Sequence, residues 1–509
     1  MTNVLRVATA LVSRRLTTNR IVIAGLALAF GLIMAMASIS STKASVHPDE
    51  FGHWPVFHYF VEHWLPPAVD DPAVLPSMTI WGTSYLFLLD VSYMVAARVM
   101  SPFIGIFSSE LYAARLFHSL LWALLCLCAL RRRDWAIPLS VLLLSPQIWY
   151  IFSYYNADAF PLFIAMLATM LLCDRKNTIH SYIQGSGKIS AAVLTLGLCL
   201  GLLLVSKQNY VVLVPGFLLW LAVMHLDLRW RELLAVLAAM GLLGTSVFLG
   251  DVPRSSGQHA WFVFTALTGG ALAIVAAISF CLRLRNNAAL RRPSIRWIGI
   301  CVLAVAFAAP RVLVDVAING GPNEKATRIL AVEEARAGAG FKPSEVVQGK
   351  GVAYQMLDIQ GVGLRPMIFD APYNWLSRSV ASAFGVYGYM TVYAPYPVYL
   401  ALVILASLIA VVAGFALTRA WPDKANRLLV AAAGIGCLIV LSSILNSWFI
   451  ALQPQGRYLL PIMVMLALIL GYARPKLPQG ILQALLIASL LLSAYSFVCV
   501  ALPAFAHAN

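Results

Sequence analysis

The feature that most constrains this chain is a series of apolar stretches, each roughly 20 residues long, recurring from residue 21 to residue 501. A helix of about that length crosses the hydrocarbon core of a bilayer. Hydrophobic residues make up 61% of the sequence and charged residues only 11%, unlike soluble domains. The sequence therefore predicts an all-α polytopic membrane protein. We expect about 13 transmembrane helices, in the ranges 21–41, 111–130, 135–153, 159–173, 190–206, 208–224, 233–250, 261–282, 298–315, 398–417, 428–446, 458–472 and 481–501.

The net charge of +15 has a topological explanation. Lys and Arg gather in alternate connections between the apolar stretches, most densely in 131–134, 283–297 and 418–427. Cytoplasmic loops of membrane proteins collect cations in this way. The pattern predicts a multi-pass protein of the cytoplasmic membrane with a cytoplasmic N-terminus. It contains no basic stripe or binding motif for nucleic acid, so we expect no nucleic-acid partner.

Two long connections are predicted on the extracytoplasmic side. The first loop, 41–110, includes the segment 78–107, which is apolar enough to span but would invert the charge pattern downstream if it did. We expect a re-entrant or juxtamembrane element there, alongside interfacial helices. The second connection, 316–397, has a soluble composition and predicts a small cap. The chain would thus consist of an N-terminal module over 1–315, this cap, and C-terminal helices over 398–509.

Adjacent acids, Asp49 and Glu50, follow the first apolar stretch. His53 lies three residues after Glu50, so on a helix the two would share a face and could hold a metal or couple their protonation. An alternative is that Asp49 caps the aromatic helix predicted over 51–64. Capping explains one acid and not the pair, which favours a functional role.

Three further charged residues depart from the pattern on the same predicted side. Asp158 lies between two closely spaced spans, where it could be a helix cap or a functional acid. Lys207 and Arg457 are cations on the side that should lack them, and either could extend to lipid headgroups or bind an anionic group such as a lipid phosphate. No nucleotide-binding loop is apparent. A transferred group would therefore arrive on an activated lipid.

These residues form an ordered set of motifs. They are Pro48-Asp49-Glu50, Asn156-Ala157-Asp158, the isolated Lys207, and Gln455-Gly456-Arg457-Tyr458-Leu459-Leu460-Pro461. Together they resemble the GT-C superfamily of polytopic glycosyltransferases, in particular its bacterial members that end in a Gln-Gly-Arg-Tyr signature. The resemblance implies a GT-C-like fold. It also implies inverting transfer of a sugar from a polyprenyl-phosphate donor to a cell-envelope acceptor, at the extracytoplasmic face.

The resemblance assigns roles to the individual residues. It implies that Asp49 is the base that deprotonates the acceptor, with Glu50 and Asp158 as further catalytic acids. The donor phosphate would be held by Lys207, Gln455, Arg457 and Tyr458. Acceptor contacts are expected from His53, Trp54, Asn156, Arg378 and Tyr389. A divalent cation, Mg²⁺ or Mn²⁺, could be held by Asp49, Asp158 and His53, although the first loop lacks an Asp-x-Asp pair. The expected partners are the lipid-linked donor, membrane lipids, and a glycan, lipid or protein acceptor.

The sequence leaves two other functions open. A transporter or flippase of lipid-linked sugars would also need cations for a phosphate, but such proteins usually carry ionisable residues at the membrane midplane. An O-antigen-type ligase or polymerase would use arginines of its large loop, for which Arg336, Arg365 and Arg378 are available.

Overall fold

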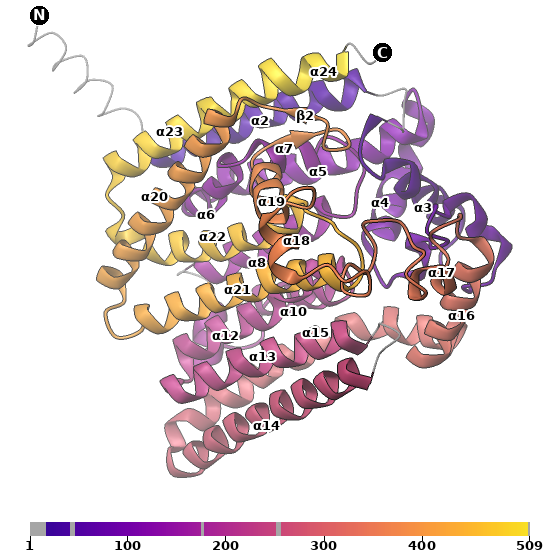
Figure 1. Ribbon diagram of the computed structural model, residues 1–509. Helices are drawn as coiled ribbons and strands as arrows, with labels where there is room; N and C mark the ends of the chain where they lie inside the picture. Colours follow the sequence, from indigo (N-terminus) through magenta and orange to yellow (C-terminus); the bar gives the residue numbers. More distant parts are fainter. Residues whose placement is uncertain (1–16, 41–45, 175–177, 251–255, 507–509) are drawn as a thin grey trace, which may run out of the picture.

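The computed structural model describes residues 17–40, 46–174, 178–250 and 256–506. The described chain is almost entirely helical (Figure 1). Its strands are β1 (Val386–Tyr387) and β2 (Val392–Tyr393), which pair antiparallel in one short hairpin. Among the described residues, ten helices are long and apolar enough to cross a membrane. The prediction of an all-α polytopic membrane protein is confirmed.

The ten spans come from both halves of the chain. They are α2 (Thr18–Ile39), α5 (Glu110–Arg131), α11 (Gln208–Val211) with α12 (Leu213–His225), α13 (Trp230–Gly250), α14 (Ser256–Asn286), α15 (Ala288–Asn319), α20 (Tyr396–Ala420), α21 (Ala425–Phe449), the 3-10 turn η7 (Gly456–Leu459) with α22 (Pro461–Ala473), and α23 (Gln479–Tyr495), which continues through a π-helical turn (Ser496–Ala501) into α24 (Leu502–Ala506).

The other predicted spans take shorter forms. The ranges 159–173 and 190–206 become the short apolar helices α8 (Ala159–Cys173) and α10 (Ala191–Leu204). The range 135–153 is broken into α6 (Ala136–Leu139), a 3-10 turn and α7 (Pro146–Ile151). Pro146 cannot donate a backbone hydrogen bond, so it starts a new helix, which Ser145 caps through its side chain. This broken segment is buried inside the bundle, where other protein segments can satisfy its backbone groups.

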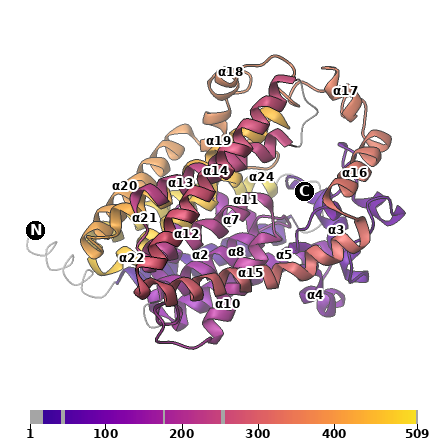
Figure 2. The ribbon, with the colours of Figure 1, turned by 90° about the horizontal axis from the view of Figure 1, so that it is seen from below.

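The two long connections meet at one end of the bundle, which we call the cap end (residues 46–110 and 320–395). Figures 1 and 2 show α3 (Glu50–Glu62) of the first loop beside α16 (Pro322–Arg336), with α4 (Ser92–Met100) and α17 (Pro343–Val347) at the same end of the bundle. The Val69 N–H donates to Asn319 Oδ1 at 3.0 Å, and the Gly338 N–H donates to the Ile80 carbonyl at 3.0 Å. The first loop is therefore joined to the end of α15 by a bond to a side chain and to the cap by a backbone hydrogen bond.

The segment 78–107 contains no helix of spanning length. Its main helix, α4, runs into a 3-10 turn over Ser101–Ile106, and together they cover only Ser92–Ile106. The end of the bundle opposite the cap end contains the short connections 131–135, 226–229 and 421–424. The helix α9 (Thr178–Gln184) lies between α8 and α10 in the sequence.

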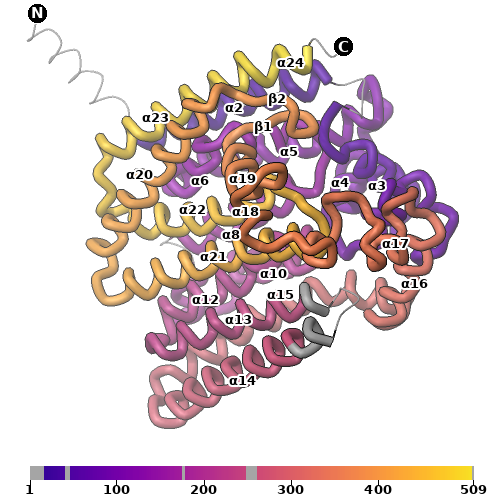
Figure 3. Tube along the Cα trace, viewed as in Figure 1, coloured from indigo at the N-terminus to yellow at the C-terminus, as the bar shows by residue number. Residues whose placement is uncertain are grey.

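The second half of the cap folds back over the bundle. Figure 3 shows this orange segment, with α18 (Leu364–Phe369) and α19 (Trp375–Ala383), crossing between the first-loop helices and the C-terminal helices. As a result α19 packs against η7, and β1 packs against α7. Segments more than 200 residues apart in sequence thus share one surface.

The arrangement predicts which connections face the outside of the cell. In a variant whose native cysteines are replaced, Lys350→Cys at the cap end should react with an impermeant thiol reagent added to intact cells. Arg132→Cys at the opposite end should react only after the membrane is permeabilised. Labelling of position 132 in intact cells would overturn the orientation predicted from the charges.

Candidate active site

Four charged side chains meet at the cap end of the bundle. Arg457 Nη2 donates to Asp49 Oδ2 at 2.6 Å, and Lys207 Nζ donates to Asp158 Oδ2 at 2.7 Å. The two pairs are in contact, because Arg457 Nε lies 3.9 Å from Asp158 Oδ2. Asp158 is fully buried and Arg457 is 6% exposed, whereas Asp49 is 36% exposed. The cluster therefore runs from the protein interior towards an accessible carboxylate.

Helix capping does not account for either acid. Asp49 precedes α3 and Asp158 precedes α8, but neither side chain makes a capping hydrogen bond. At α8 the capping acceptor is Asn156, whose Oδ1 accepts from the Asp158 and Ala159 N–H groups. The two carboxylates are left to bind the two cations. Lys207 and Arg457 are likewise held by protein carboxylates in this structure.

The position of Asp49 depends on its backbone. Asp49 has φ 61°, the left-handed conformation that Asp tolerates better than most residues, and Glu50 begins the α-helix directly after it. The two neighbouring side chains therefore diverge. Asp49 turns to Arg457, and Glu50 turns into the protein.

A cavity of about 150 Å³ opens beside Asp49 and Arg457. Five separate segments line it: the first loop, α7 with the residues after it, α19, the β1–β2 hairpin and the connection before α22. The lining residues are Pro48, Asp49, Gln147, Tyr150, Tyr154, Arg378, Ser382, Val386, Gly388, Tyr389, Met390, Gln455, Gly456 and Arg457. Two guanidinium groups and one partly exposed carboxylate lie among aromatic and amide groups, a composition that suits a polar ligand.

The charge of Asp49 is fixed by its neighbours. Burial alone would raise the pKa of Asp49, but the adjacent Arg457, together with His53 and Lys207, outweighs burial and lowers that pKa. His53 behaves differently, because burial lowers its pKa to about 3. Its Nδ1 is hydrogen-bonded to the Tyr93 hydroxyl at 2.8 Å. At neutral pH the site thus contains an ionised Asp49 and a neutral His53.

Arg457 retains donors for a ligand. Within the described chain its Nε and Nη1 make no hydrogen bond of good geometry. A buried guanidinium with unused N–H groups is suited to bind phosphate oxygens. The ring of Tyr458 lies beside both cations, 5.0 Å from Lys207 Nζ and 5.4 Å from the centre of the Arg457 guanidinium.

Gly456 brings the Arg457 backbone close to α19. A Cβ at this position would overlap the backbone of Ala383, and the Gly456 N–H donates to Ser382 Oγ at 2.6 Å. In the structure the close approach is made by helix α19, which fixes the direction from which Arg457 enters the cluster.

Glu50 does not line the cavity. Its carboxylate forms a fully buried ion pair with Arg115 of α5, through Arg115 Nε at 2.8 Å and Arg115 Nη2. Arg115 Nη1 also donates to the Ser40 carbonyl, and Glu50 Oε1 accepts from the Tyr155 N–H at 2.8 Å. This network ties the end of α2, the start of α3 and the segment before α8 together. It positions the loops that carry Asp49 and Asp158.

The structure separates the predicted acceptor residues into two groups. Arg378 and Tyr389, with the predicted donor residue Gln455, line the cavity. His53, Trp54 and Asn156 are not among the described residues that line it. Asn156 caps α8, and His53 packs against the ring of Tyr85 at 4.2 Å. These residues are used in the packing of the surrounding loops.

Sequence reasoning missed Arg115, Gln147, Tyr150 and Tyr154. Arg115 could have been noticed as a cation inside a predicted span, a position where a charge needs a partner. The tyrosines carried no such signal, because aromatic residues are common in membrane helices. Tyr150 connects two parts of the site: its hydroxyl accepts from the Gly388 N–H at 3.1 Å and is hydrogen-bonded to His47 Nδ1 at 2.9 Å.

The residues suggested for a divalent cation do not fit one. The described residues contain no group of three or more His, Cys, Asp or Glu side chains placed to hold a metal ion. Arg457 is in contact with the carboxylates of both Asp49 and Asp158, and His53 Nδ1 is hydrogen-bonded to the Tyr93 hydroxyl. A guanidinium in contact with both acids occupies the place that a cation would take.

Comparison with known proteins gives a distant structural similarity. The chain is similar to the crystal structure of ArnT from Cupriavidus metallidurans bound to undecaprenyl phosphate, with 14% sequence identity over 89% of this chain and 78% of that chain, and a TM-score of 0.26. A similarity of this size carries no inference about ligand or activity. No family model matches the chain, and no curated protein matches it by sequence.

Breaking the Glu50–Arg115 pair should destabilise the protein. Glu50→Gln leaves a buried, uncompensated guanidinium, which costs about 3–5 kcal/mol. The double variant Glu50→Gln/Arg115→Met removes that charge and should recover part of the loss. Thermal unfolding in detergent measures both. Equal melting temperatures for wild type and Glu50→Gln would contradict the positioning role.

Proposed function

We propose that this chain is an inverting glycosyltransferase that moves a sugar from a polyprenyl-phosphate donor to a cell-envelope acceptor. The reaction would take place at the extracytoplasmic face of the cytoplasmic membrane, which is the predicted location of the cap end. The observation that carries the proposal is the contact between two acid–cation pairs beside one cavity: Asp49 with Arg457, and Asp158 with Lys207.

Asp49 is the proposed general base. Its carboxylate is ionised, it is the most exposed member of the cluster, and it faces the cavity. An acceptor hydroxyl hydrogen-bonded to Asp49 would attack the anomeric carbon while its proton passes to the carboxylate. The bond between the anomeric carbon and the phosphate oxygen would break from the opposite side, and its electron pair would remain on the phosphate. One displacement of this kind inverts the anomeric centre.

Arg457 and Lys207 are proposed to stabilise the departing phosphate. Negative charge develops on the phosphate oxygen as the bond breaks, and fixed cations in a buried site stabilise it more strongly than water would. Arg457 can offer Nε and Nη1 while Nη2 stays on Asp49. Asp158, which is fully buried, holds the Lys207 ammonium in position. Its proposed role is to orient this cation.

The position of the cluster favours an enzyme over a transporter. Asp158 precedes α8 and Lys207 precedes α11, so these charges lie at helix ends at the cap end. A transporter binding site would be expected near the membrane midplane. For an O-antigen-type ligase or polymerase, Arg378 is the supporting feature, because it lines the cavity while Arg336 and Arg365 are exposed elsewhere.

Replacement of the proposed base should abolish most of the transfer. Asp49→Asn removes the proton acceptor but keeps the shape of the side chain, so transfer of radiolabelled sugar from a polyprenyl-phosphate donor should fall by about 10²–10⁴-fold. Asp70→Asn, an exposed acid in the same loop, is the matched control and should retain full activity. Transfer by Asp49→Asn at the wild-type rate would eliminate Asp49 as the base.

The same assay separates donor binding from proton transfer. Lys207→Met should raise the donor KM or lower kcat, because the donor phosphate loses a cation. Unchanged donor kinetics in this variant would leave only a structural role for Lys207. Loss of activity in Arg378→Ala with one class of acceptor alone would favour the ligase-type reaction.

The lowered pKa of Asp49 predicts a pH profile. Because its carboxylate is already ionised well below neutral pH, kcat/KM should not decline as the pH falls from 8 to about 5. Arg457→Lys weakens the hydrogen bond that lowers the pKa of Asp49, so the effect of burial, which raises this pKa, should gain weight. The decline of kcat/KM at acid pH should then begin at a higher pH. A decline of the wild-type kcat/KM already above pH 5, at a pH that changes in Asp49→Glu, would show that Asp49 is protonated in this range. That outcome would contradict the lowered pKa of Asp49.

A further inference from the structure

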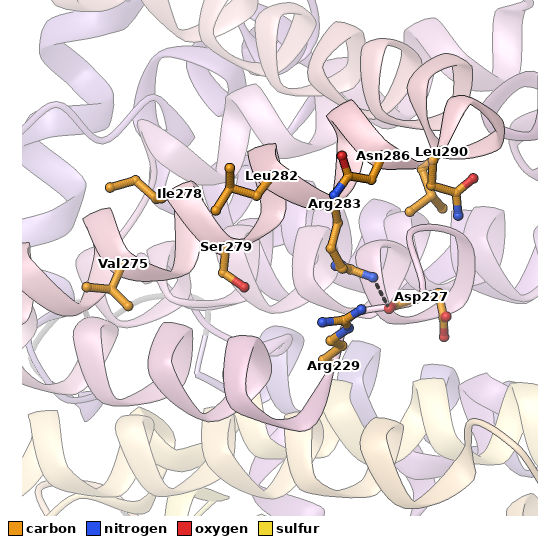
Figure 4. A pocket seen from close by; sticks show the side chains of 10 residues that line it. Asp227, Arg229, Val275, Ile278, Ser279, Leu282, Arg283, Asn286 and Leu290 are labelled. Atoms are coloured by element: carbon orange, nitrogen blue, oxygen red, sulfur yellow. Dashed lines mark hydrogen bonds between the residues drawn. The ribbon is translucent and has the colours of Figure 1, made fainter.

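A larger cavity lies at the opposite end of the molecule from the candidate active site. It has a volume of about 680 Å³ and is formed by the α12–α13 connection, the C-terminal half of α14 and the start of α15 (Figure 4). Lys207 lies just before α11, and Asp227 and Arg229 follow α12, so the paired helices α11 and α12 separate the two cavities. This second cavity takes no part in the proposed sugar transfer.

The cavity has an apolar wall that faces the membrane. Val275, Ile278 and Leu282 lie on one face of α14 at helical spacing, and each is about half exposed. They belong to a membrane-spanning helix whose surface is mostly not covered by the rest of the protein. A surface of this kind contacts lipid chains when the helix lies in a bilayer.

The other end of the cavity is polar and positively charged. Both of its acidic neighbours are neutralised: Glu232 binds Arg283 at 2.7 Å, and Asp227 binds Arg427 at 3.0 Å. Ser279 also donates to Glu232 Oε1 at 3.0 Å. Within the described chain the exposed side chain of Arg229 has no ion pair, so it gives this end of the cavity its net charge.

Amide groups complete the polar end. Asn286 and Asn287 line the cavity next to Arg283, as Figure 4 shows for Asn286. Asn287 Oδ1 accepts the capping bond from the Ala289 N–H, so the groups of this side chain that remain for a ligand are the amide N–H donors. From Val275 to Asn286 the helix rises about 16 Å, which is comparable to the phosphate and upper acyl chain of one phospholipid.

We propose that this cavity binds an anionic glycerophospholipid of the membrane leaflet at this end. Its phosphate would bind the Arg229 guanidinium and the Asn286 amide, and one acyl chain would lie along Val275, Ile278 and Leu282. Charge and shape both support this occupant, since an uncompensated guanidinium favours a bidentate phosphate and the apolar wall continues towards the bilayer centre. The lipid would fill the space between the α13–α14 hairpin and α15.

Native mass spectrometry of the full-length protein in detergent tests the proposal. After addition of phosphatidylglycerol or phosphatidylcholine with the same acyl chains, the wild type should retain phosphatidylglycerol preferentially. Arg229→Ala should weaken this binding roughly tenfold, a change of about 1.4 kcal/mol. Arg231→Ala is the matched control, because Arg231 is an exposed arginine two residues away that does not line the cavity, and it should bind as the wild type does.

A second variant tests the apolar wall. Ile278→Trp should fill the space beside the acyl chain and reduce binding of both lipids, with the melting temperature measured to check folding. Equal binding of the two lipids by the wild type, or wild-type binding by Arg229→Ala, would overturn the proposal. Preference for polyprenyl phosphate over phosphatidylglycerol, or a protein dimer that excludes lipid, would also overturn it. None of these outcomes depends on sugar transfer.

Discussion

The structure at the cap end depends on the cost of an unpaired charge inside a bundle of apolar helices. Removing an ion from water costs several kcal/mol unless a partner and further hydrogen bonds compensate. Arg115 is fully buried, and its guanidinium is compensated by Glu50 and by the carbonyl at the end of α2. That requirement joins segments that carry Asp49 and Asp158. The buried pair of Arg115 and Glu50 therefore helps to position the acids, together with the left-handed backbone at Asp49.

The cluster of Asp49, Asp158, Lys207 and Arg457 obeys the same rule but keeps hydrogen-bonding groups that a ligand could use. These four side chains neutralise one another, which makes their burial tolerable. Two Arg457 nitrogens nevertheless make no hydrogen bond within the described chain, and Asp49 remains accessible. The proposed function uses this incomplete pairing: a lipid phosphate would supply the missing acceptors, and an acceptor hydroxyl would supply a donor to Asp49.

The two ends of the molecule have different arrangements of charge. At the cap end, two acid–cation pairs are in contact beside a small cavity, with Asp158 buried and Asp49 accessible. At the opposite end, Glu232 and Asp227 are each paired with an arginine, and Arg229, which has no ion pair within the described residues, lines a larger, partly apolar cavity. Physically, the first arrangement suits chemistry on a polar group held away from water, and the second suits retention of an amphipathic molecule.

Much of this could be read from the sequence, because lipid imposes a strong rule on composition. Long apolar stretches specified helices, and charges that broke the pattern marked Asp49, Asp158, Lys207 and Arg457 as candidates, since such charges are retained only where they are paired or used. The sequence could not say which of the neighbouring acids faces the cavity. That was decided by the left-handed backbone at Asp49 and by Arg115, which lies 65 residues from Glu50. The sequence also could not reveal that α19 packs directly on Gly456, or that the range 135–153 is a broken segment sheltered by other helices. Composition and spacing are local properties, whereas the pairing of buried charges and the shelter of irregular backbone depend on segments that only the folded chain brings together.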